Sequence, residues 1–166
     1  MIKKQAEIYL DHLDVREHLY LTIGITTKMP EKLEGITLPL PSPEPAMYQM
    51  LKVLIQANLS KEKQLLVLAH EMIHVKQYAK NELITMHDKR VVWKGKKHYY
   101  SQADNLNKPW EKEAYRNDHI LAQIDEPSQN PKQETLAEQI PNRISNSTTY
   151  KCSYVIEKCK EQKTSS

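Results

Sequence analysis

The chain has 166 residues, of which 39% are hydrophobic and 27% charged, and its formal net charge is +3. That length supports one substantial hydrophobic core, and the weak charge, without a dense basic run carrying aromatic residues, argues against nucleic acid as a partner. The start of the chain lacks the apolar stretch of a secretory signal, and its longest clean apolar run, 65–69, is far too short to cross a membrane. We therefore expect a cytoplasmic, soluble protein without a membrane partner, and the oligomeric state stays open.

The first third of the chain predicts a small sheet. Residues 7–15 fit either a short helix or a strand, whereas 19–26 alternate apolar and polar side chains with the period of a half-buried strand. Residues 27–45 hold five of the nine prolines, which predicts an irregular connector with one short strand at 35–38. Residues 50–56 predict a further strand. It is either an ordinary sheet strand or an edge strand that can bind an extended peptide through main-chain hydrogen bonds.

A long helix is predicted at 61–80. Ser60 is a suitable N-cap, and no Gly or Pro interrupts the segment. At about 100° per residue, His70 and His74 share one stripe of this helix with Gln77. The opposite stripe is aliphatic, so we expect it to face the core and the histidines to face a cleft; its members are Leu65, Leu68, Met72, Val75 and Ala79.

His70, Glu71 and His74 form the pattern His-Glu-x-x-His. Two histidines spaced four apart on a helix can both bind one zinc ion, and the glutamate can take a proton from the water that the metal activates. The alternative is a pair of solvated or hydrogen-bonded histidines without a metal. A catalytic zinc has three protein ligands and one open position, so a further ligand should lie downstream.

The segment after this helix predicts two strands, 83–93 and 98–101, with a tight turn at 94–96. A loop then leads into a second helix at 110–125. Trp93 and Trp110 are interpreted as core anchors. Four histidines have no ligand spacing and are treated as bystanders: His12, His18, His87 and His119.

The composition changes at residue 126, where Pro, Ser, Asn, Gln and Lys replace aliphatic residues. We therefore expect one domain at 1–125, followed by a loosely ordered polar tail at 126–166. Cys152 and Cys159 lie in that tail and are interpreted as ordinary thiols, since neither a histidine partner nor a metal-binding spacing accompanies them.

Glu111 and Glu113 open the second helix, and either carboxylate could complete a His-His-Glu zinc site. By helix angle Glu113 falls near Ile120 and Ile124, on what we expect to be the buried side. A buried, unpaired carboxylate is costly, so Glu113 would need a metal or a cation.

The run LAHEMIHVKQY at 68–78, followed by PWEKEAY at 109–115, resembles small gluzincin-type zinc metallopeptidases of bacteria and their phages. The resemblance covers about residues 50–125. It implies an α+β, zincin-like fold in which a small mixed sheet packs on the motif helix and a second helix carries the third metal ligand. It also implies a Zn²⁺ cofactor and a peptide or protein substrate.

The resemblance favours Glu111 as the third ligand, because Ala114 follows it as in the family. Where this chain has Tyr115, the family often has a carboxylate that hydrogen-bonds a zinc histidine. We expect Asp118, which shares a helix face with Glu111, to take over that role. Gln77 also recurs in the resemblance, and it could orient a loop or substrate or simply cap a polar face.

The expected activity is hydrolysis of peptide bonds, within a chain rather than at its end, with Glu71 as general base and His70, His74 and Glu111 as zinc ligands. A second donor should stabilise the oxyanion. The candidates, which the sequence does not rank, are His98, Tyr99, Tyr100 and Tyr115.

Two alternatives remain at this point. The fold could serve as a catalytically silent structural or binding module, for example a phage assembly or regulatory component, whose zinc only joins the helices. A purely structural site has no use for Glu71 and would fill the fourth position with protein, so the enzyme is the preferred interpretation. The other alternative is a regulator that cleaves a single partner and no generic peptide.

Overall fold

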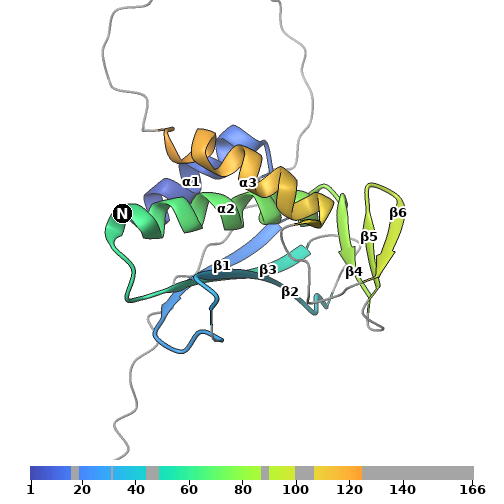
Figure 1. Cartoon of the computed structure of the whole chain (residues 1–166), viewed down its shortest axis with the longest axis horizontal. Helices are drawn as coiled ribbons and strands as arrows, with labels where there is room; N and C mark the ends of the chain where they lie inside the picture. The colour runs from blue at the N-terminus through green and yellow to red at the C-terminus, as the bar shows by residue number, and fades with distance from the viewer. Residues whose placement is uncertain (16–18, 31, 44–48, 87–89, 100–106, 125–166) are drawn as a thin grey trace, which may run out of the picture.

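The computed structural model describes residues 1–15, 19–30, 32–43, 49–86, 90–99 and 107–124. Within them the chain is α+β, as predicted (Figure 1). In chain order the elements are α1 (Ile2–Leu13), β1 (Leu19–Thr26), β2 (Gly35–Leu40), β3 (Gln49–Gln56), α2 (Lys61–Ala79), β4 (Leu83–Thr85), β5 (Arg90–Trp93), β6 (Lys96–Tyr99) and α3 (Pro109–Ala122). The predicted tail, both cysteines, His18, His87 and Tyr100 lie outside the described residues.

The first sheet has the order β1-β3-β2, with β1 parallel and β2 antiparallel to β3. It is therefore a small mixed sheet, as expected. β3 lies in its centre and β2 at an edge, so of the two alternatives for 50–56 the structure supports the ordinary sheet strand and not the edge strand. Alternation along a strand determines which side chains share a face, whereas the order of strands depends on how the chain crosses over.

Helix α2 lies between this sheet and the other two helices (Figure 1). Leu51, Val53 and Ile55 point from β3 into the core. α2 contributes buried side chains on several sides, namely Val67, Leu68, Ala69, Met72, Ile73 and Val75. The helix is thus embedded in the molecule, and its two histidines line a groove beside α3, as their stripe predicted.

Helix α1 settles the ambiguity at 7–15 in favour of helix. Its buried residues Ile2, Ala6, Tyr9 and Leu10 recur with helical spacing, which places one apolar face against the core. The helix ends at Asp14, which adopts the left-handed conformation with φ 52°.

A second, antiparallel sheet has the order β4-β5-β6. The single strand predicted at 83–93 is wrong, because the chain reverses between β4 and β5 without a Gly or Pro to mark the reversal. The expected tight turn is present between β5 and β6, where Lys94 and Gly95 have φ 44° and 80°. Trp93 and Trp110 are buried together in a small cluster, as predicted for core anchors.

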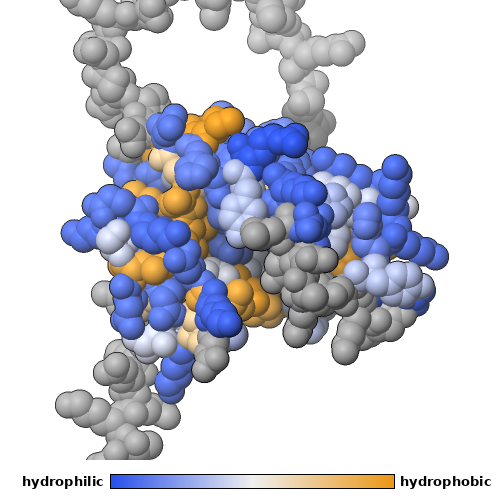
Figure 2. All heavy atoms as spheres, viewed as in Figure 1, coloured by the Kyte–Doolittle hydropathy of each residue, from blue (hydrophilic) through white to orange (hydrophobic). Residues whose placement is uncertain are grey.

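In Figure 2, hydrophilic side chains cover the β5–β6 hairpin at the right, and hydrophobic ones reach the surface near α2 at the left. Among the described residues no helix has the length and apolar character needed to cross a membrane.

Candidate metal centre

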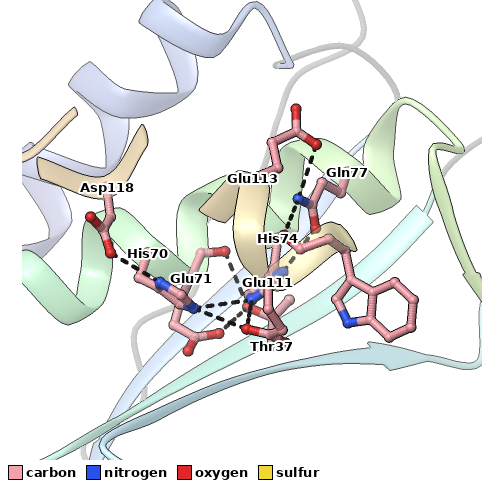
Figure 3. Close-up of polar contacts among 9 residues, drawn as sticks. Thr37, His70, Glu71, His74, Gln77, Glu111, Glu113 and Asp118 are labelled. Carbon is pink, nitrogen blue, oxygen red and sulfur yellow. Dashed lines mark hydrogen bonds and ion pairs between the residues drawn. The ribbon is translucent and has the colours of Figure 1, made fainter. Parts of the chain in front are cut away.

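Three potential ligand atoms converge where α2 meets the first turn of α3 (Figure 3). α2 begins at its predicted N-cap, since the Ser60 hydroxyl accepts a hydrogen bond from the Lys63 amide. One helical turn separates His70 from His74, so their Nε2 atoms lie 3.2 Å apart. Glu111, in the first turn of α3, places Oε2 3.5 Å from each of them. We call these three atoms the ligand triangle.

The size of the ligand triangle fits a tetrahedral metal ion. With zinc bonds of about 2.0–2.1 Å, tetrahedral ligand atoms lie about 3.3–3.4 Å apart. The three separations of 3.2, 3.5 and 3.5 Å bracket that value. Two imidazoles and a carboxylate are also a donor set that zinc uses with a fourth position open.

The outer nitrogens of both histidines have fixed partners. His70 Nδ1 lies 3.1 Å from Asp118 Oδ2, the contact that the shared helix face predicted, and His74 Nδ1 lies 2.8 Å from Gln77 Oε1. Both partners accept, so each Nδ1 carries the proton and each neutral ring presents a bare lone pair at Nε2. Two lone pairs and a carboxylate oxygen therefore face one another, an arrangement that needs a cation in its centre.

In the metal-free protein a proton can take that place. Burial lowers the pKa of His74, but the hydrogen bond to Glu111 and the charges of Glu71 and Glu111 outweigh it and raise the pKa to about 9. Burial likewise raises the pKa of Glu111, and the bonds and charges of His70 and His74 overcome it and lower that pKa to about 2. The carboxylate is thus ionised and ready to bind a cation.

Glu113 does not join the ligand triangle. Its carboxylate contacts Lys76 at 3.0 Å and Lys94 at 3.4 Å. These two ammonium groups are the cation partner that we expected a partly buried Glu113 to need. Burial raises its pKa, and the bond and charge of Lys76 reverse that shift and lower it. The prediction that Glu113 shares a buried side of α3 with Ile120 is wrong, however, because Ile120 is 62% exposed.

Gln77 is fully buried, with 0% of its surface exposed, and ties the two ligand-bearing helices together. Besides accepting from His74, it donates from Nε2 to the main-chain oxygen of Trp110 at 3.0 Å and to Glu113 Oε2 at 3.3 Å. These donations fix which end of the amide faces His74. The sequence offered a signal for this role, since Gln77 shares the stripe of the two histidines.

Glu71 leaves α2 on a different side, towards β2. It is 5% exposed, and its Oε2 accepts a hydrogen bond from the Thr37 hydroxyl at 2.6 Å. Burial raises the pKa of Glu71, against the opposing effects of His74, the Thr37 hydrogen bond and His70. A carboxyl group whose pKa is raised binds a proton more readily than an exposed one, as a general base requires. Nothing in the sequence around Thr37 indicated this contact.

A groove of about 1030 Å³ opens onto these side chains. It is lined by β2, by α2 from Lys63 to Tyr78, by parts of β4 and β5, and by the α3 residues Glu111, Tyr115 and Asp118. His119 also borders it, beside Asp118 and outside the ligand triangle.

The three oxyanion candidates that the structure describes occupy different surroundings. The Tyr115 ring lies 4.5 Å from the His70 ring and lines the groove. Burial, and then the negative charge of Glu111, raise the pKa of Tyr115, so its hydroxyl keeps its proton. His98 packs edge-on against Trp110, and Tyr99 is 83% exposed. Tyr115 is thus the described candidate best placed to donate into the groove.

No family model, no curated protein and no solved structure matches this chain. The resemblance to gluzincin-type metallopeptidases therefore stays a prediction from the two motifs. The chemistry of the site must be argued from its own geometry.

Proposed function

We propose that this protein is a zinc-dependent peptidase in which His70, His74 and Glu111 hold the metal and Glu71 is the general base. The ligand triangle carries the proposal, because its separations match a tetrahedral zinc site and its three potential ligand atoms converge on one point. A bound zinc ion would supply a Lewis acid that polarises the scissile carbonyl and activates the attacking water.

The chain's own residues would carry the proton and orient the site. Glu71 accepts the proton of the attacking water and returns it to the leaving amine. Asp118 and Gln77 hold the two imidazoles in the tautomer that points Nε2 inwards. Tyr115, protonated at neutral pH, donates to the developing oxyanion.

The groove favours cleavage within a peptide. Its α2 lining runs from Lys63 to Tyr78, about 22 Å at a helical rise of about 1.5 Å per residue. That length accommodates about six residues of an extended chain. β2 lines the same groove as a sheet edge, so an extended substrate can pair with its main chain.

The test combines metal content with hydrolysis of a pool of unstructured peptides, followed by mass spectrometry. We expect the parent and Glu71→Gln each to hold about one equivalent of zinc, and Glu71→Gln to lose about 10²–10⁴-fold in rate. Glu62→Gln, which changes an exposed glutamate on the same helix, is the matched control and should behave as the parent. Equal rates in the parent and Glu71→Gln would instead support a structural zinc module.

A further inference from the structure

Strand β2 turns one face towards α2. Gly35 and Thr37 pair with Ile55 and Val53 of β3, both of which are fully buried in the core. Since paired residues on neighbouring strands share a face, Gly35 and Thr37 also point towards the helix. They meet α2 at Glu71.

Thr37 binds Glu71 at two points. Its Oγ1 lies 2.6 Å from the side-chain oxygen Oε2 and 3.1 Å from the main-chain oxygen of the same residue (Figure 3). A hydroxyl has one proton and can rotate between two acceptors. It can therefore donate to Oε2 when Glu71 is ionised. When Glu71 holds a proton, the hydroxyl can accept that proton's hydrogen bond and donate to the main-chain oxygen.

Gly35 makes this close approach possible. A Cβ at this position would lie 2.5 Å from Val67 Cγ1 and 2.8 Å from Glu71 Oε1, separations that side-chain atoms do not tolerate. The strand and the helix are therefore in direct contact at the point where Glu71 emerges. Gly35 leaves room for the Glu71 carboxylate, and Thr37, two residues further along the same face of β2, binds it.

We propose that Thr37 is a positioning residue for Glu71: its hydroxyl holds one carboxylate oxygen and leaves the other to the attacking water. The proposal rests on the proposed peptidase function. A carboxylate held at one oxygen has its rotation restricted before substrate arrives, and misplacement of a reacting group by about 1 Å can cost about 10²-fold in rate. In this role the Thr37 hydroxyl acts only through Glu71, to which both of its hydrogen bonds run.

The test compares Thr37→Val, which removes the hydroxyl at nearly constant shape, with Thr37→Ser, which keeps it. Thr22→Val is the matched control, because it makes the same change on the opposite face of the same sheet. We expect Thr37→Val to hold about one equivalent of zinc, to lose about 10–100-fold in kcat and to keep its KM within about twofold. Thr37→Ser should recover most of the rate. If Thr37→Val folds poorly, Thr37→Ala removes the same hydroxyl without the added methyl.

A second readout separates this proposal from the peptidase function. The cobalt-substituted protein is titrated with a peptide hydroxamate, a metal-chelating group that also shares a proton with the general base, and the visible spectrum is followed. Thr37→Val and Glu71→Gln should both weaken hydroxamate binding, and Thr37→Ser and Thr22→Val should not.

The outcomes are distinct. A parent that binds metal and hydroxamate but cleaves no peptide overturns the peptidase function, and the titration alone then decides the role of Thr37. Thr37→Val with the parent's kcat, or with the parent's hydroxamate affinity when no peptide is cleaved, overturns the positioning role. A parent that takes up no metal overturns both.

Discussion

At the scale of single residues, the spacing of His70 and His74 predicted their convergence, because helical geometry alone brings side chains four apart onto one stripe. The choice between Glu111 and Glu113 was harder. The two side chains point about 200° apart around α3, so the answer depends on how that helix is rotated against α2. The structure turns Glu111 towards the histidines and Glu113 towards Lys76. No local pattern encodes that rotation.

The proton at His74 should compete with metal. The folded, metal-free protein has a His74 pKa of about 9, above the ordinary value of 6.5, so this group stabilises the fold fully below pH 6.5 and loses that effect as pH rises through 9. Zinc must displace the proton throughout that window. We therefore expect the apparent zinc affinity to rise about tenfold per pH unit from about pH 6.5 to about 9.

A competition titration against a chromophoric chelator, corrected for the chelator's own protonation, measures this slope. A zinc affinity that levels off above pH 7 would show that the charges of Glu111 and Glu71 do not raise the pKa of His74 as described.

At the scale of elements, the junction of α2 and α3 depends on a buried polar side chain. The amphipathic interpretation of α2 correctly placed the two histidines on a groove, but it did not foresee that α3 covers part of the same stripe, at Gln77, with polar partners. Hydrophobic periodicity identifies apolar faces, but it does not reveal a face that is buried through hydrogen bonds.

Removing the Gln77 amide should weaken that junction. Gln77→Leu leaves His74 Nδ1 and the Trp110 main-chain oxygen without their partner in a buried position. We expect zinc affinity to fall about 10–100-fold and the free energy of unfolding of the metal-free protein to fall by about 1–3 kcal/mol.

Isothermal titration with zinc and urea unfolding measure the two effects of Gln77→Leu. Gln64→Leu, a change of a half-buried glutamine in the first turns of the same helix, is the control and should leave zinc affinity unchanged. An unchanged affinity in Gln77→Leu as well would mean that His74 keeps its orientation without this contact.

At the scale of the whole molecule, the sequence predicted the class of the fold and most of its elements, but not the arrangement of its strands. The parallel pairing of β1 with β3 leaves β2, which lies between them in sequence, at the edge. β2 contains Gly35 and Pro39 in a proline-rich stretch, so it gave a weak strand signal. β2 borders the groove, but its place at the edge of the sheet was not visible in the sequence.

Metal binding should stabilise the folded chain as a whole, because the ligand triangle joins α2 to α3 and does not exist in the unfolded state. At a free zinc concentration 1,000 times its dissociation constant, the expected gain in the free energy of unfolding is about 4 kcal/mol.

Thermal unfolding with zinc and with excess EDTA measures the gain. The chelator should lower the Tm of the parent and leave that of His74→Ala, which lacks one ligand, nearly unchanged. A parent Tm that is indifferent to both additions would contradict a metal centre, whatever its activity.

The position of the ligands along the chain has a topological consequence. His74 and Glu111 are distant in sequence, and the whole β4-β5-β6 sheet lies between them. A bound cation would therefore close the polypeptide between these two ligands into a ring that contains that sheet. Cleavage of the peptide bond between Lys94 and Gly95 would open the ring, but the two resulting chain fragments would still be joined through the metal.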